Sequence, residues 1–186
     1  MIGDEFPAVL AAARGDEAAF GRLWHDLQPR LLRYFAVAAP AAAEDLASET
    51  WLAVVRSLVR FRGIEPAFRA WVFSIAHHKA LDWHRRAARR VTDAQPLDGL
   101  VELAAPDDPA AAALEGLSTR AALAMVATLP GDQAEAIVLR VVAGLGVDQV
   151  AGIMDKQPGT IRVLTHRGLR RLAERLGGDG RMRRVV

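Results

Sequence analysis

The sequence predicts an all-α fold: two helical domains joined by a flexible acidic linker, with a helix-turn-helix in the C-terminal domain. Alanine, leucine and arginine, which favour helices, dominate the composition. Glycine and proline gather at a few places, where they are expected to end helices. Apolar residues recur at spacings of three and four, and no segment alternates for long in the way that predicts a sheet.

The N-terminal part, residues 5–90, is predicted to form four helices. Their expected ranges are 6–14, 16–38, 41–60 and 66–89. The apolar stripe of the second helix comprises Phe20, Leu23, Trp24, Leu27, Leu31 and Phe35. One face of the third helix carries Leu46, Thr50, Val54 and Leu58. Gly63 allows the turn before the fourth helix, because glycine tolerates conformations that other residues avoid.

Residues 91–117 have the composition of a linker. This stretch holds six acidic residues and no lysine or arginine, together with several prolines and glycines. We expect it to separate the N-terminal domain from a C-terminal domain at 118–177, with at most a short helical turn near 110–114.

The C-terminal domain is predicted to contain helices at 118–128 and 132–142, on either side of Leu129-Pro130-Gly131. A short amphipathic helix follows, with Val147, Val150, Ala151 and Met154 on its apolar face. After a break at 155–159, Thr160 is expected to cap a second helix. The packing seam of this helix comprises Ile161, Thr165, Gly168 and Leu172, widened by Leu164, Leu169 and Leu176. The pattern predicts a helix-turn-helix, and the alternative is a surface αα-hairpin with a solvated basic face.

Charge is unevenly distributed, although the formal net charge is only +2. Residues 69–90 contain six basic residues and one acid, and residues 156–184 contain nine basic residues and two acids. Two basic blocks on either side of an acidic stretch predict two surfaces that bind nucleic acid. The alternative for each block is an ordinary solvated face.

Several other classes of protein are disfavoured. The chain has no cysteine, and no apolar run has the length of a membrane span, so we expect a cytoplasmic protein without membrane insertion. The N-terminus lacks the pattern of a signal peptide. His77, His78 and His84 lack the acidic or cysteine partners of a usual metal site, and no nucleophile-elbow or phosphate-binding glycine motif occurs. We therefore expect no metal, no cofactor and no enzymatic activity.

Four stretches in order, which together cover most of 16–176, resemble a bacterial RNA polymerase sigma factor of the extracytoplasmic-function group (group 4 of the sigma-70 family). They are GDEAAFGRLW, AEDLASETWLAVVRSLVRFRG, AFRAWVFSIAHHKALDWHRR, and LPGDQAEAIVLRVVAGLGVDQVAGIM followed by PGTIRVLTHRGLRRL. The resemblance implies that 5–90 is sigma region 2, which binds core RNA polymerase and the −10 element. It implies that 118–177 is sigma region 4, which recognises the −35 element. The linker is then either a segment in the polymerase's RNA path or a plain tether.

The third predicted helix is implied to bind core polymerase. Asp45 and Glu49 are spaced i, i+4, so their carboxylates share one side of the helix and can meet a basic partner. By resemblance, the contact residues are Asp45, Leu46, Glu49 and Trp51. The alternative is that the two acids only keep the helix soluble.

The fourth predicted helix mixes aromatic and basic residues, which suits single-stranded DNA because rings stack on bases and cations meet phosphates. By resemblance, the loop that captures a flipped −10 base comprises Phe61, Arg62, Gly63 and Ile64. His78 and Asp82 face the melted strand, and Arg85 and Arg86 contact its backbone. The family often has asparagine at the position of His78. For Trp71, Phe73 and Trp83, packing in the core is the favoured interpretation.

The last helix is implied to bind the −35 element. By resemblance, the residues that reach the bases are Thr160, Arg162, Val163, His166 and Arg167. Phosphate contacts are expected from Lys156, Arg170 and Arg171. Where the family commonly has serine then arginine, this chain has Val163 and Leu164, which favour contact with thymine methyl groups.

The resemblance thus implies a sigma factor that binds core RNA polymerase, promoter DNA and an anti-sigma factor. One alternative is a helix-turn-helix regulator that binds duplex DNA as a dimer without core polymerase. Another is a DNA-processing enzyme that uses the histidines. The acidic third helix and the aromatic, basic fourth helix favour the sigma factor, because a plain repressor needs neither.

Overall fold

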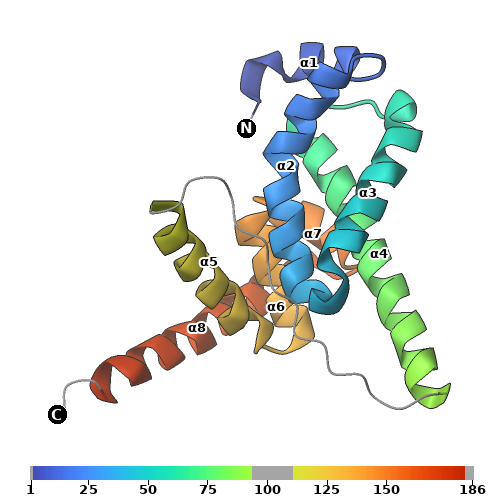
Figure 1. The fold of residues 1–186 in the computed structure, drawn as a ribbon. Helices are drawn as coiled ribbons and strands as arrows, with labels where there is room; N and C mark the ends of the chain where they lie inside the picture. The colour runs from blue at the N-terminus through green and yellow to red at the C-terminus, as the bar shows by residue number, and fades with distance from the viewer. Residues whose placement is uncertain (1, 94–110, 183–186) are drawn as a thin grey trace.

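The computed structural model describes residues 2–93 and 111–182, and every regular element in these residues is helical (Figure 1). The N-terminal helices are α1 (Phe6–Ala12), α2 (Glu17–Ala38), α3 (Ala43–Ser57) and α4 (Glu65–Asp93). The C-terminal helices are α5 (Ala111–Ala127), α6 (Gly131–Ile137), α7 (Val147–Ile153) and α8 (Pro158–Met182). A π-helical segment, η4 (Val138–Val142), continues α6. The all-α prediction is confirmed.

Helix α2 is the centre of the N-terminal domain and packs against α1, α3 and α4. It begins where Asp16 caps it, since the Asp16 carboxylate accepts a hydrogen bond of 2.8 Å from the backbone N–H of Ala18. Its buried side chains recur every four residues, at Leu23, Leu27 and Leu31. Trp24 was expected in the same stripe, but it is 36% exposed because it lies at the edge of the buried face.

Helix α3 packs between α2 and α4 and buries the face that the sequence predicted. Leu46, Thr50, Val54 and Leu58 are all buried. The hydroxyl of Thr50 donates a hydrogen bond of 2.7 Å to the carbonyl of Leu46, so its burial leaves no polar atom unsatisfied.

Helices α7 and α8 form the predicted helix-turn-helix. Asp155 turns the chain in the left-handed conformation, with φ of 51°. Next to it, the Lys156 N–H donates to the carbonyl of Ala151 at 3.0 Å. Small Ala151 and fully buried Ile161 lie on the inner faces of the two helices.

Helix α8 differs from its prediction in two respects. It begins at Pro158, a residue suited to a first helical position, so Thr160 lies within the first turn and does not cap the helix. Leu169 and Leu176 were expected to widen the packing seam but are exposed. The seam is therefore narrower than predicted: where the burial of α8 is described, Ile161 and Gly168 are buried, and Leu164, Thr165 and Leu172 are half-buried beside them.

Both helices that border the predicted linker are longer than expected. Helix α4 continues to Asp93, and α5 begins at Ala111, where the sequence predicted at most a short turn and then a domain start at 118. The remainder of the predicted linker, 94–110, lies outside the described residues.

The two domains pack against each other. Helix α2 contacts α5, α6 and η4, and α4 contacts α7. In Figure 1 the C-terminal helices α6 and α7 accordingly lie beside the N-terminal helices. This packing brings residues about a hundred positions apart in the chain into direct contact.

Candidate functional site

Helix α8 presents a basic face to solvent. Ile161 and Gly168 are buried against the rest of the domain, whereas Arg162, His166 and Arg167 are exposed. The sequence-predicted residues of this helix that are exposed are Thr160, Arg162, Val163, His166, Arg167, Arg170 and Arg171. A straight helix with one buried and one basic face can enter the major groove of DNA.

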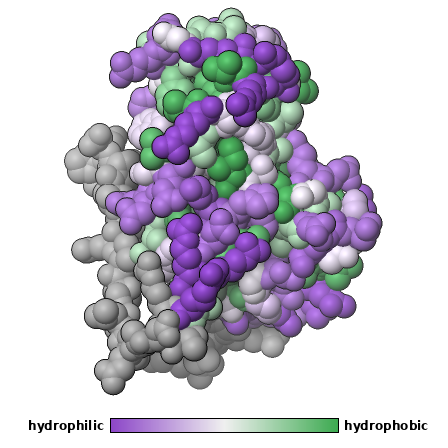
Figure 2. All heavy atoms as spheres, turned by 90° about the vertical axis from the view of Figure 1, so that its right-hand side faces the viewer, coloured by the Kyte–Doolittle hydropathy of each residue, from purple (hydrophilic) through white to green (hydrophobic). Residues whose placement is uncertain are grey.

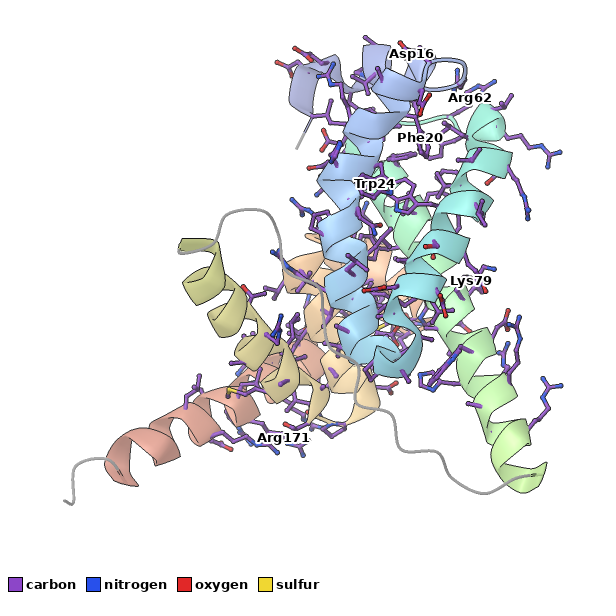
Figure 3. All side chains as sticks on the ribbon, viewed as in Figure 1. Asp16, Phe20, Trp24, Arg62, Lys79 and Arg171 are labelled. Carbon is purple, nitrogen blue, oxygen red and sulfur yellow. The ribbon has the colours of Figure 1, made fainter. Side chains whose placement is uncertain are left out.

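Two residues that were predicted to hold phosphates are engaged with α6. The Lys156 ammonium forms an ion pair of 3.0 Å with Asp132. Arg171, labelled in Figure 3, donates a hydrogen bond of 3.0 Å to the side-chain oxygen of Gln133. Both cations therefore brace α8 and its preceding turn against the start of α6. Arg170 differs, because its partner Glu174 is on the same exposed helix at 3.3 Å.

The loop before α4 is held in one conformation by aromatic packing. The ring of Phe61 stacks on Trp71, with centroids 5.0 Å apart and planes 29° apart, and meets Phe68 edge-on at 5.3 Å. Gly63 has φ of 154°, and a Cβ there would lie 3.1 Å from the Phe61 ring. Glycine is therefore needed at that position.

The same loop leaves one large apolar side chain exposed. Ile64 is among the most exposed apolar residues of the described chain. Arg62 instead turns back on its own loop and donates to the carbonyls of Val59, at 2.7 Å, and Phe61, at 2.8 Å. Phe61 is half-buried, so part of its ring supports the loop.

A polar row follows the outer side of α4. His78, Arg85 and Arg86 are exposed, and Asp82 pairs with Arg85 at 3.0 Å. The His78 Nδ1 atom lies 2.6 Å from the Ser74 carbonyl, which can only accept, so Nδ1 carries the proton. In the neutral ring Nε2 is then an acceptor, suited to an amino group on a base edge.

The four residues predicted to contact polymerase from α3 are not on one surface. Asp45 is exposed, and Glu49 is half-buried with its carboxylate 2.7 Å from the Lys79 ammonium between α3 and α4 (Figure 3). Leu46 and Trp51 are only 3% and 6% exposed, because they face the core. The Trp51 indole donates to Gln28 at 2.7 Å, so even its polar atom is satisfied internally.

Three apolar side chains lie on the outer face of α3 and of the 3₁₀ turn at Leu58–Arg60 that follows it, and the sequence interpretation missed them. Leu52, Val55 and Val59 are 55%, 52% and 61% exposed and recur at i, i+3 and i+7. Figure 2 faces this side of the molecule and shows apolar surface between hydrophilic residues. The sequence contains a signal for this apolar surface, since these residues recur at helical spacing on the side of the helix opposite the predicted buried face.

The histidines of α4 have protein partners. His77 bonds to Glu135 at 2.7 Å, and the ring of His84 lies 2.7 Å from the carbonyl of Ala38. Within the part of the chain that the structure describes, no three metal-binding side chains gather at one point. No helix in that part is both long and apolar enough to span a membrane.

Glu135 joins the two domains. The Tyr34 hydroxyl donates to its carboxylate at 2.6 Å, beside the His77 contact. Burial alone would raise the pKa of the Glu135 carboxyl, but hydrogen bonds from His77 and Tyr34 and the attraction of His77 outweigh it, so the pKa is lowered. Burial and then the Glu135 charge raise the pKa of Tyr34 well above its ordinary value. Glu135 is thus ionised and Tyr34 remains protonated at neutral pH.

Both domains match models of known protein families. The family model "Sigma-70 region 2" matches residues 23–90, and "Sigma-70, region 4" matches residues 112–172. The ECF RNA polymerase sigma factor SigD of Mycobacterium tuberculosis is 32% identical over 188 residues, covering 97% of this chain and 88% of SigD. The chain belongs to the ECF family of RNA polymerase sigma factors.

Two further comparisons agree with this membership. The ECF sigma factor BldN of Streptomyces coelicolor is 36% identical over 175 residues, and this chain spans 65% of its length. The structure of the sigma factor RpoE with the anti-sigma factor NepR from Bartonella quintana matches with a TM-score of 0.63 and 27% identity, covering 84% of this chain and 97% of that one.

The family assignment explains why both predicted DNA-binding surfaces occur in one chain. The region 2 match includes α3 and most of α4, and the region 4 match includes α7 and the first 15 residues of α8. A helix-turn-helix regulator that acts without polymerase is therefore not favoured.

Proposed function

We propose that this ECF sigma factor directs transcription initiation with three separate surfaces, one for core RNA polymerase and two for promoter DNA. The outer face of α3 binds the polymerase. The loop at 61–64 and the polar row of α4 bind the melted −10 element. The exposed face of α8 binds the −35 element.

The polymerase surface combines acidic and apolar side chains. Asp45 and Glu49 provide the charge, and Leu52 and Val55 provide apolar area beside them. Leu46 and Trp51 act from the core, where they fix the position of the helix. Charge guides the encounter and apolar contact adds affinity, which is the usual division of work at an interface.

The −10 surface depends on a rigid loop. Phe61 and Gly63 hold the loop in shape, so that Ile64 and the backbone around Arg62 border the space for an unstacked base. His78 and Asp82 offer hydrogen-bonding atoms to the bases. Arg85 and Arg86 meet the phosphates of the same strand.

At the −35 element, α8 lies in the major groove. Arg162 and Arg167 donate to guanine edges, while Thr160, Val163 and His166 contact neighbouring bases. Arg170 holds a phosphate. Lys156 and Arg171 reach the backbone from the positions where they brace α6, so their loss affects the domain as well as the DNA contact.

The remaining parts of the proposal concern partners and place. Because the RpoE structure contains the anti-sigma factor NepR, we infer that an anti-sigma factor also controls this protein. The protein acts in the cytoplasm, where polymerase and promoter DNA are found. Its role is binding, with no catalysis and no cofactor.

The observation that carries the proposal is the exposed acidic and apolar face of α3 in the same chain as the basic α8. The test is a direct binding assay with core polymerase. Asp45→Arg places a positive charge against a basic partner surface and should weaken binding at least about tenfold, or about 1.4 kcal/mol.

Glu17→Arg is the matched control, because it makes the same charge change at the start of α2, the end at which Figure 3 labels Asp16. It should bind core polymerase like the wild type. Equal affinities of Asp45→Arg and the wild type, with both chains folded by circular dichroism, would remove α3 from the polymerase interface. A loss of promoter-specific transcription with retained core binding would place the defect on the DNA side.

A further inference from the structure

The N-terminal segment, residues 2–14, precedes the part of the chain that matches the sigma region 2 family model, which begins at residue 23. Its helix α1 is attached to the domain by buried apolar side chains, because Phe6, Val9 and Leu10 are at most 5% exposed. The Phe6 ring lies 5.5 Å from the ring of Phe68 on α4. In Figure 1, α1 lies at the same end of the N-terminal domain as the connection between α3 and α4, which contains the loop proposed to bind an unstacked −10 base.

Arg14 reaches this loop from the turn between α1 and α2. Its guanidinium donates a hydrogen bond of 2.9 Å to the backbone carbonyl of Phe61. Arg62 donates to the same carbonyl at 2.8 Å, so both lone pairs of this oxygen are used by charged donors. Because the carbonyl belongs to the planar peptide between Phe61 and Arg62, the two bonds fix the orientation of the peptide with which the loop begins.

The N-terminal segment also holds the other end of the loop. The backbone N–H of Gly3 donates a hydrogen bond of 2.8 Å to the carboxylate of Glu65, the residue that follows Ile64 and begins α4. The second oxygen of the same carboxylate accepts from Arg69 at 2.8 Å. The segment therefore contacts the residues at both ends of the loop, and the exposed side chain of Ile64 lies between these contacts.

We propose that the N-terminal segment is part of the −10 site, and that Arg14 is a positioning residue, which sets the shape of the loop through the Phe61 carbonyl. The inference rests on the proposed function, because it assigns a role at the loop that binds the melted strand. Arg14 lies outside the residues that match the region 2 family model, and its partner is 47 positions away in the chain.

A role in stability alone does not explain the placement of Arg14. Its side chain is exposed, and an exposed hydrogen bond contributes little to the free energy of folding, because water can replace either partner. The turn that carries it is fixed independently, since Ala13 is buried and Asp16 caps α2. The bond instead restricts the Phe61 peptide, whose ring is already stacked on Trp71 with centroids 5.0 Å apart. Ring and carbonyl of Phe61 are thus held by separate partners.

The first test is transcription by the holoenzyme from a library of promoters with randomised −10 elements. The wild type should select one base at the position that the loop captures. Arg14→Ala frees the Phe61 carbonyl, so it should weaken that preference at least about threefold and leave selection at the other −10 positions unchanged. Arg14→Lys keeps a charged donor and should restore part of the preference. Equal preference at every −10 position in Arg14→Ala and the wild type overturns the proposal.

Arg22→Ala is the matched control. Arg22 of α2 also holds the N-terminal segment, but its partner is the exposed Glu5 within the segment itself. This variant should select −10 bases like the wild type. A relaxed preference in Arg22→Ala would overturn the role of Arg14, since loosening of the segment would then be sufficient. A uniform loss of transcription from all promoters in Arg14→Ala, without altered base preference, would overturn it as well, because a merely destabilised protein behaves in that way.

A second measurement isolates the captured base. The holoenzyme is bound to a single-stranded −10 oligonucleotide, and to the same oligonucleotide without the base at the position that the library identifies. The missing base should weaken binding by the wild type about tenfold, but binding by Arg14→Ala by about threefold or less, because both changes remove the same contact. Equal losses in the two proteins overturn the proposal.

The two levels of the argument fail in different ways. A wild-type holoenzyme that shows no −10 preference and no effect of the missing base would defeat the proposed function of the loop. A wild-type preference that Arg14→Ala retains in full would defeat only the role of Arg14.

Discussion

Helices α8 and α3 are both amphipathic, but they differ in how exposed their candidate contact residues are. On α8 all the residues proposed to contact DNA bases are exposed, and the buried seam is narrow. On α3 half of the predicted contact residues are in the core. Each helix packs on two others, α8 on α6 and α7, and α3 on α2 and α4. They differ in how much of the helix is buried: α3 buries six of its 15 residues, whereas Ile161 and Gly168 are the buried residues of α8 where its burial is described.

The difference predicts distinct consequences of mutation. A substitution on the outer face of α8 should change binding and leave stability nearly intact. A substitution at a buried α3 position should lower the stability of the fold more than it changes binding directly. Substitutions of Trp51 in α3, of the arginines on α8 and of the glycines of the helix-turn-helix test this contrast.

The largest effect is expected from Trp51→Ala. Trp51 is buried, meets Phe20 edge-on at 5.6 Å and donates to Gln28. Removing a buried aromatic side chain from a core typically costs about 3–5 kcal/mol of the free energy of unfolding. Urea denaturation of the variant should show this loss.

Trp51→Phe is the control, because it keeps a ring and removes the indole N–H that bonds to Gln28. It should be destabilised less than Trp51→Ala. If Trp51→Ala unfolded at the urea concentration of the wild type but no longer bound core polymerase, Trp51 would be a direct contact and the contrast between α3 and α8 would disappear.

The fold was predictable from local patterns to a large extent. The four-residue spacing of Leu23, Leu27 and Leu31 and the stop at Pro130-Gly131 both correspond to observed features. Helix ends were less predictable. Pro158 begins α8 because proline suits the first turn of a helix. In the sequence alone, however, Pro158 indicates the end of a helix as readily as the start of one.

The second prediction concerns base recognition by α8. Arg162→Ala and Arg167→Ala should each leave stability unchanged and cost about 1–3 kcal/mol of −35 binding when the arginine contacts a base. At least one of them should relax the preference at one −35 position. The measurement is transcription over a library of promoters with randomised −35 elements.

Arg170→Ala is the appropriate phosphate control, because Arg170 is exposed and its partner is on the same helix. It should lower transcription from all promoters alike. Arg171→Ala is a poorer control, since Arg171 also bonds to Gln133 of α6. Equal losses for Arg162→Ala, Arg167→Ala and Arg170→Ala, without altered base preference, would mean that α8 holds DNA by charge alone.

The parts of the site that sequence could not predict all depend on distant partners. No local pattern pairs Tyr34 with Glu135, which are 101 positions apart, or Arg171 with Gln133. The histidines show the same limit. His77 and His78 are adjacent in sequence, but the first joins the domains and the second faces solvent.

The smallest effect is expected from two glycines of the helix-turn-helix, and it tests how tight the α8 seam is. Alanine is the better helix former, so Gly152→Ala, where an added Cβ meets no atom within 4 Å, should stabilise the protein by about 0.5–1 kcal/mol. At Gly168 the same methyl group would lie 2.6 Å from Cδ1 of Ile137 and 3.4 Å from both Gln133 and Leu129.

Ile137 is itself buried, so it has little room to move away from a methyl group at position 168. Overpacking of a core typically costs about 1–3 kcal/mol, which exceeds the gain in helix propensity. Gly168→Ala should therefore melt below the wild type in a circular dichroism scan, and Gly152→Ala above it. Two variants with the same raised melting temperature would show that α8 can shift on α6. The seam would then be a loose contact, and the exposure of its basic face would no longer follow from tight packing on the opposite side.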